Sequence, residues 1–437
     1  MSLKMSWKKL LCSKRFYDMK KDSLKEGRGS FHRDLDRIIF SHAFRRLAKK
    51  TQVHPLALND HMHTRLTHSL EVSSVGRSLG FLVGQKIKRA LPNKFSPLML
   101  GEIVQAACLA HDIGNPPFGH AGEDAIKNWF RQHKIEYLAD LSDEQADDFQ
   151  NFEGNAQGFR VLTKLEYARP GGMRLTYATL GAFLKYPWSP SELKKDKEKE
   201  KASVFFSEIE SLRDIAGKTG MLNQGYAFWL RHPLAYLTEA ADDICYGIVD
   251  LEDAYEMNIV PPKRVRDIFL SFCADPSSCK KEIALIVETQ GIPYLRGKAI
   301  DSLIRQAVEV FNSNKTDILM GAFTGSLMDR VKGYKMKIKP ISKKIYDHPR
   351  KVEIEKGAYT TLGLLLETFC SAAKEQAGRD VLSFKSKRVL KLMGAGAPGP
   401  QDSLYAAYLK VVDFISGMTD DYAIHIANQI SGRAKQI

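Results

Sequence analysis

The sequence predicts an all-α protein with one short β element near residues 334–355, and three observations support this class. Apolar residues recur at helical spacing through long stretches, most clearly in 34–50 and 65–91. Hydrophobic residues make up 44% of the 437 residues, which is enough for a large core, and no apolar run approaches the roughly 18 residues of a transmembrane helix. Only 333–346, "GYKMKIKPISKKIY", alternates lysine with apolar residues in the way of a strand.

The expected helices share a 3.6-residue apolar repeat and recognisable ends. Pro92 ends one of them, and Pro97 opens the next, which is apolar almost all round and is therefore expected in the core. In chain order the expected helices are 34–50, 65–91, 97–114, 121–133 and 232–258, with further helices from about 358 to 437.

Length and composition divide the chain into parts, since 437 residues suggest two to three domains. We expect an N-terminal segment at 1–30, a core at 31–260 and a mainly helical C-terminal region at 261–437. The run "KKDKEKEK" (194–201) has eight consecutive charged residues and predicts a mobile surface excursion at about 190–203.

Cysteine usage and net charge indicate the cellular compartment and the kind of binding partner. None of the six cysteines forms a C-x-x-C pair, and the N-terminus lacks the apolar core of a signal peptide, so we expect a cytoplasmic protein with reduced thiols and no membrane partner. A net charge of +14 attracts polyanions such as nucleotides or nucleic acid, although a basic soluble surface explains it equally well.

Residues 111–123, "HDIGNPPFGHAGE", surround a stiff turn with titratable side chains. His111 and Asp112 end a helix, His68 lies on an earlier helix, and Asp242 lies on a later one. Taken singly, each is more often a core histidine or a helix cap than a metal ligand. As an ordered set, the two imidazoles and two carboxylates indicate a catalytic divalent metal site that leaves positions open for water and substrate.

This set of His68, His111-Asp112 and Asp242 resembles the HD superfamily of metal-dependent phosphohydrolases. The sequence around these residues is similar to that of the bacterial deoxyguanosinetriphosphate triphosphohydrolase family, whose reaction converts a dNTP to a deoxynucleoside and tripolyphosphate. The blocks that carry the resemblance are "FRRLAKKTQV" (44–53), "RLTHSLEV" (65–72), "HDIGNPPFGHAGE" (111–123), "FEGNAQGFRVL" (152–162), "LTYATLGAFLKYPW" (175–188) and "EAADDICYGIVDLEDA" (239–254).

The resemblance implies an HD-domain helical core and a role for further residues. His120 and Glu123 match the catalytic histidine and its acidic partner, and their spacing of three puts them on one helical face. Arg65 matches a phosphate-contacting arginine. The positions expected to contact the deoxyribose are Gln52, Tyr246 and Asp250. The simpler structural explanations are that Glu123 stabilises the start of its helix, that Arg65 is an exposed residue at a helix start, and that Tyr246 packs in the core.

The expected cofactor is Mn²⁺ or Mg²⁺, with Ni²⁺, Co²⁺ and Fe²⁺ as alternatives for this donor set. The resemblance also implies a homo-oligomer, commonly a hexamer. The lysine-rich segment 335–344 could neutralise triphosphate, a nucleotide effector or single-stranded DNA, or simply be a solvated edge strand. Two other functions stay open, namely another HD nucleotide phosphohydrolase (a nucleotidase or phosphodiesterase) and a nucleic-acid-binding protein without turnover.

Overall fold

The protein is seen in a computed structural model that describes residues 4–17, 28–51, 64–194, 199–257, 259–283, 291–346, 349–378 and 381–433. The described chain is mostly helical, and its one sheet is a two-stranded antiparallel pair, β1 (Asn223–Gly225) with β2 (Phe228–Trp229). The predicted all-α class is confirmed. Among the described residues, no helix is both long enough and apolar enough to span a bilayer.

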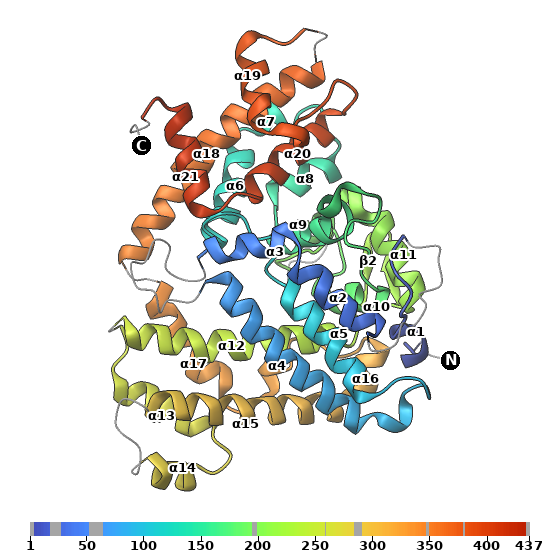
Figure 1. Cartoon of the computed structure of the whole chain (residues 1–437), viewed down its shortest axis with the longest axis vertical. Coiled ribbons are helices and arrows are strands. Elements are labelled where there is room, and N and C mark those ends of the chain that lie inside the picture. Colours follow the sequence, from blue (N-terminus) through green and yellow to red (C-terminus); the bar gives the residue numbers. More distant parts are fainter. Residues whose placement is uncertain are drawn as a thin grey trace.

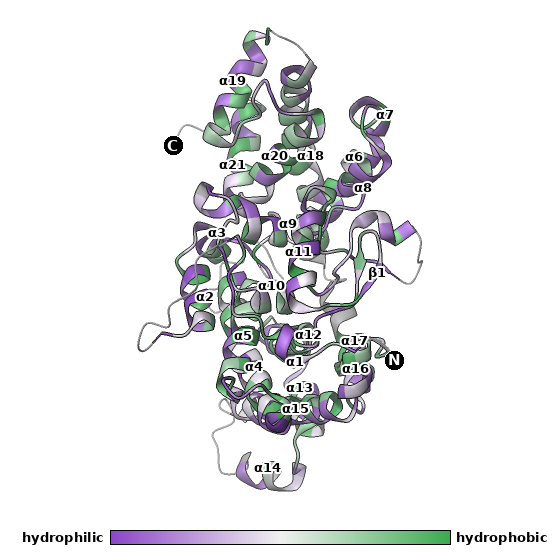
Figure 2. Cartoon of the chain, turned by 90° about the vertical axis from the view of Figure 1, so that its right-hand side faces the viewer, coloured by the Kyte–Doolittle hydropathy of each residue, from purple (hydrophilic) through white to green (hydrophobic). Residues whose placement is uncertain are grey.

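The helices pack around two hydrophobic clusters that stack along the long axis of the molecule (Figures 1 and 2). The larger cluster collects helices from the N-terminal three quarters of the chain. These are α1 (Trp7–Leu10), α2 (Ser30–Ile39), α3 (His42–Arg46), α4 (Arg65–Lys86), α5 (Pro97–Ala110), α10 (Tyr177–Phe183), α11 (Ile209–Thr219), α12 (Ala235–Glu256), α13 (Pro262–Phe272), α14 (Pro276–Ile283), α15 (Gly291–Ser313), α16 (Lys315–Met320) and α17 (Tyr334–Tyr346).

The smaller cluster joins two distant parts of the sequence, because residues 118–156 pack against 358–427. Its helices are α6 (His120–Gln132), α7 (Lys134–Tyr137), α8 (Asp143–Gln150), α18 (Pro349–Gly378), α19 (Phe384–Leu392), α20 (Leu404–Ser416) and α21 (Asp420–Ile430). The short helix α9 (Gly154–Arg160) contributes to both clusters. The hydrophobic core is therefore not divided at residue 260, where the sequence suggests a domain boundary.

Close packing of α4 on α5 fixes where His68 and His111 lie. Three glycines of α4, four residues apart, face α5, and a Cβ would lie 2.4 Å from Cys108 Sγ at Gly76, 2.6 Å from the Leu100 carbonyl at Gly80 and 2.7 Å from Pro97 Cα at Gly84. The two helices run antiparallel, since later glycines meet earlier residues of α5. The start of α4 is thereby placed beside the end of α5.

The predicted β element near 334–355 is wrong in position. Residues 334–346 form α17 and α18 begins at Pro349, whereas the short β element lies at 223–229. Tyr334, Ile338 and Ile341 are buried at helical spacing, whereas Met336, which also alternates with lysine, is exposed. Over so short a stretch the alternation with Lys335 and Lys339 does not distinguish the two periods.

Two other expected segments differ in detail from the structure. The single helix expected at 34–50 is interrupted at Ser41, whose side chain accepts a hydrogen bond from Phe44 N and caps α3. In the charged excursion, Pro190–Lys194 form a 3-10 helix, and the Lys201 carbonyl accepts a hydrogen bond from Trp188. Residues 195–198 lie outside the described residues.

Candidate active site

The start of α4 and the end of α5 bring three predicted ligands together. His68 lies in the first turn of α4, which Thr64 caps by accepting a hydrogen bond from Thr67 N. His111 is the C-cap of α5, and Asp112 follows it. The ligand atoms of His68, His111 and Asp112 all lie within 4.8 Å of one another.

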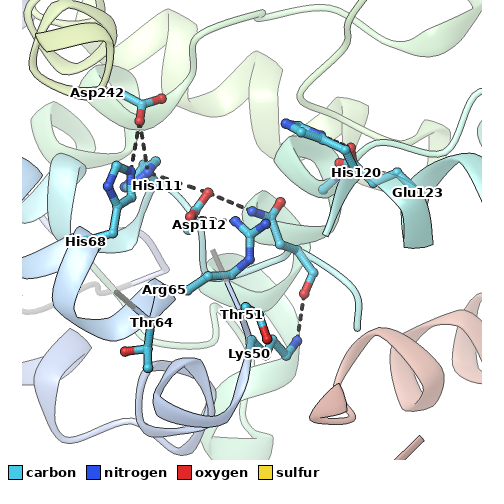
Figure 3. Close-up of polar contacts among 12 residues, drawn as sticks. Lys50, Thr51, Thr64, Arg65, His68, His111, Asp112, His120, Glu123 and Asp242 are labelled. Atoms are coloured by element: carbon cyan, nitrogen blue, oxygen red, sulfur yellow. Dashed lines mark hydrogen bonds and ion pairs between the residues drawn. The ribbon is translucent and has the colours of Figure 1, made fainter. Parts of the chain in front are cut away.

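The fourth predicted ligand comes from α12, more than a hundred residues later. Asp242 Oδ1 lies 3.2 Å from His68 Nε2 and 3.3 Å from His111 Nε2 (Figure 3). Three helices thus contribute two imidazoles and two carboxylates to one cluster.

The tautomer of His111 suits a metal ligand. Its Nδ1 lies 2.7 Å from the Cys108 carbonyl, so that nitrogen carries the hydrogen and Nε2 presents a lone pair. Nε2 is buried and has no hydrogen-bond partner among the described residues, although it faces Asp242. A lone pair that faces a carboxylate oxygen is stabilised by a proton or a metal ion between them, and a divalent metal fits this donor set.

Neighbouring cationic side chains keep the carboxylates of Asp112 and Asp242 ionised. Burial alone would raise the pKa of Asp112, but His111 and Arg65 bring it below its usual value, and Arg65 Nη1 lies 2.7 Å from Asp112 Oδ2. Burial would likewise raise the pKa of Asp242, but Lys185 and His111 hold it well below its usual value. Both carboxylates therefore stay charged and available as ligands at neutral pH.

Sequence reasoning missed two partners of these carboxylates. Lys185 Nζ lies 2.5 Å from Asp242 Oδ2, and Asn115 donates a 2.6 Å hydrogen bond to Asp112 Oδ1. Asn115 stands inside the 111–123 motif, so its spacing of three from Asp112 could have suggested the contact. No sequence signal connects Lys185 with α12, because only folding brings them together.

The turn between the two ends of the motif is packed against neighbouring backbone. A Cβ at Gly114 would lie 2.0 Å from Gly158 N. Gly119 has a φ of +59°, and a Cβ there would lie 2.3 Å from Arg65 Nη2. Only glycine satisfies both the backbone angle and the close approach, so the turn is held in one shape.

Helix α6 begins at the far end of that turn with His120. His120 Nδ1 lies 2.7 Å from Glu123 Oε2, and Glu123 Oε1 accepts a 2.7 Å hydrogen bond from Gly154 N. Burial would raise the pKa of Glu123, but the hydrogen bond and charge of His120 lower it to about 2. The His120 side chain is 64% exposed, whereas that of Glu123 is 7% exposed. A buried carboxylate thus orients an accessible imidazole (Figure 3).

The predicted deoxyribose contacts fall in two places. Tyr246 and Asp250 follow Asp242 at intervals of four on α12, with Tyr246 half-buried and Asp250 buried. Spacing of four keeps the three side chains on one side of the helix. Gln52 lies outside the described residues.

Comparison with known proteins identifies the family of this chain. The HD domain family matches residues 65–157, which include His68, His111 and Asp112. A deoxyguanosinetriphosphate triphosphohydrolase-like protein of Pseudomonas aeruginosa is 48% identical over 98% of this chain and 99% of the relative. One of Synechocystis is 40% identical over 98% of this chain and 99% of the relative.

The deoxyguanosinetriphosphate triphosphohydrolase of Salmonella typhimurium is 30% identical over 90% of this chain and 92% of that protein. Identity of this extent over nearly the whole length, together with the HD domain match, means that the chain belongs to the deoxyguanosinetriphosphate triphosphohydrolase family of the HD superfamily.

Proposed function

We propose that this family member hydrolyses dNTPs, with dGTP among its substrates, to a deoxynucleoside and tripolyphosphate by attack of water at the α-phosphorus. The observation that carries the proposal is the convergence of His68, His111, Asp112 and Asp242, with a third and accessible histidine, His120, at the other end of a rigid turn. A phosphohydrolase needs both a cation at the phosphate and a group that moves a proton.

The four clustered residues would hold a divalent metal ion, which we propose to be Mn²⁺ or Mg²⁺. When bound, that ion would supply Lewis-acid charge to the phosphoryl group and to the attacking water. Two protein cations accompany it, because Arg65 and Lys185 each pair with one of the carboxylates. Arg65 Nε is buried without a hydrogen-bond partner among the described residues, and we propose that Arg65 contacts a phosphate oxygen of the substrate.

His120 would move the proton. Its Nδ1 is held by Glu123, which leaves Nε2 as the atom that exchanges a proton with the reacting oxygen. Because Glu123 is ionised and bound on its other oxygen by Gly154 N, the imidazole keeps one orientation. The pair thus resembles the base and orienting carboxylate of other hydrolytic sites.

Selection of deoxyribose would fall to Gln52, Tyr246 and Asp250. We propose that the Tyr246 ring packs against the C2′ edge of the sugar and crowds out a 2′-hydroxyl. Gln52 and Asp250 would bond the 3′-hydroxyl. A nucleotide effector, single-stranded DNA and a homo-oligomer stay predictions.

Product analysis tests the proposal directly. The purified protein is incubated in H₂¹⁸O with Mn²⁺ or Mg²⁺ and each of the four dNTPs, alone and in pairs, and with GTP. We expect deoxynucleoside plus tripolyphosphate from dGTP, ¹⁸O on the tripolyphosphate, and little turnover of GTP. Formation of dGMP and pyrophosphate would instead indicate another class of HD phosphohydrolase. Salt-sensitive DNA binding without turnover would favour a binding protein.

A further inference from the structure

The junction between the last two helices contacts the turn of the catalytic motif. Asp420, the first residue of α21, is buried, and its Oδ1 accepts a 2.9 Å hydrogen bond from Phe118 N. Its Oδ2 accepts hydrogen bonds from Thr51 N at 3.1 Å and Thr51 Oγ1 at 2.8 Å. One carboxylate therefore joins residues 51, 118 and 420.

Lys50 makes a second connection between the same three segments. Its buried Nζ donates 2.6 Å hydrogen bonds to the Asn115 carbonyl and to the Ser416 carbonyl at the end of α20. Asn115 is also fixed through its side chain, which donates to Asp112. The turn between the metal cluster and His120 is thus held from the C-terminal helices at two points.

The turn needs such support because Phe118 has a φ of 64°. A left-handed conformation is strained for a non-glycine residue and persists where its surroundings hold it. The Phe118 side chain packs in the smaller hydrophobic cluster, and Asp420 binds its N–H. Phe118 lies two residues before His120, so a shift of this backbone would move the imidazole.

A role for Asp420 in favouring the helix N-terminus does not account for this arrangement. Asp421 lies in the same first turn and offers the same interaction with the helix dipole, but it is exposed. Asp420 instead is buried, and both of its carboxylate oxygens accept hydrogen bonds from groups outside its own helix. The comparison separates a cap effect from a contact with the catalytic turn.

We propose that Asp420, with Lys50, is a positioning residue that holds the turn carrying His120 from the C-terminal helices. It does not touch the reacting atoms and acts through Phe118 and Thr51. The inference rests on the proposed function only for the role of His120. It makes the last two helices of the chain a part of the active-site framework.

The test compares Asp420→Asn with Asp421→Asn. An amide has one acceptor oxygen where the carboxylate has two, so Asp420→Asn leaves either Phe118 N or Thr51 N without its acceptor. We expect kcat to fall about 10–100-fold, as for other supporting contacts, with Mn²⁺ affinity within twofold of the wild type. Asp421→Asn should match the wild type in both. Thr51→Val, which removes one hydrogen bond, should lower kcat less and show non-additive coupling with Asp420→Asn.

Hydrogen–deuterium exchange of the peptide covering 112–123 gives a readout that does not depend on substrate. Faster exchange there in Asp420→Asn, but not in Asp421→Asn, supports the inference even if the wild type turns out not to hydrolyse dNTPs. Unchanged exchange overturns it. If the wild type hydrolyses dNTPs and exchange is faster in Asp420→Asn, two kinetic results still overturn the inference. One is that Asp420→Asn keeps the wild-type kcat, and the other is that its Mn²⁺ affinity falls in parallel with kcat.

Discussion

The two ends of the 111–123 motif both carry a histidine beside a carboxylate, yet they differ in exposure. The His111 side chain is 4% exposed and that of His120 is 64% exposed. At the first end the imidazole is locked by the Cys108 carbonyl and faces a buried cluster of charges. At the second end only the carboxylate is buried, so the imidazole can reach substrate. Burial, more than residue type, separates the pair that we propose to bind metal from the pair that we propose to transfer a proton.

The largest effect should come from breaking the buried end. His111→Ala removes a central donor, and we expect loss of Mn²⁺ binding and about a 10⁴-fold or greater fall in kcat, since the metal supplies several kcal/mol. His133→Ala is the matched control, because His133 also caps a helix and its Nδ1 lies 2.9 Å from the Trp129 carbonyl. Calorimetric titration with Mn²⁺ measures the difference. Equal Mn²⁺ affinity in His111→Ala and the wild type would contradict the ligand assignment.

Breaking the exposed end should spare the metal. His120→Ala is expected to lower kcat about 10³-fold, within the usual range for loss of a general acid or base, while Mn²⁺ affinity stays unchanged. Steady-state kinetics and the same titration check the two halves of this statement. Survival of the original rate would remove His120 from the mechanism.

A smaller effect is expected at the carboxylate that orients His120. Glu123→Gln keeps the shape but loses the ionised acceptor, and we expect kcat to fall about 10–100-fold. Asp124→Asn, one residue further along α6 and exposed, is the control and should keep full activity. An equal loss in both variants would mean that general acidity of the helix start matters, and not the contact with His120.

The smallest effect concerns another histidine, His232, which is fully buried and whose two ring nitrogens both pair with backbone atoms. Its Nε2 lies 3.1 Å from the Leu10 carbonyl and its Nδ1 accepts from Leu234 N. Burial lowers its pKa to about 4, whereas burial at His111 is overcome by Asp112 and Asp242, which raise that pKa. The contrast shows that neighbouring carboxylates can offset the effect of burial on the pKa of an imidazole.

His232 therefore predicts acid destabilisation. Between pH 6.5 and 4 the unfolded chain binds a proton that the folded chain excludes, so stability falls as the pH falls through this range. From pH 7 to 5 the loss attributable to His232 is about 2 kcal/mol. Urea unfolding at both pH values measures it, and His232→Gln, which can keep both hydrogen bonds, should lose that much less than the wild type. Equal losses in both proteins would contradict the prediction.

Local pairs were predictable because their geometry is set by helical spacing. His120 and Glu123 are three residues apart, so periodicity alone places this pair on one side of a helix, whereas the adjacent His111 and Asp112 need the turn that follows them to bring their side chains together. The Lys185 contact with Asp242 and the Asp420 contact with Phe118 were not predictable, since 57 and 302 residues separate the partners. Nothing in the local sequence states which distant segment will cover such a group.

The sequence by itself determined the all-α class, the order of the four clustered residues and the identity of the proton-transfer pair as a hypothesis. It did not decide the helical state of 334–346, because a five-residue alternation is too short to exclude either period, and the exposure of Met336 with burial of Ile338 and Ile341 chooses the helix. Tertiary structure alone decided which charges face each other in the site. The physical reason is that ionisation and hydrogen-bond satisfaction depend on desolvation by segments far away in the chain.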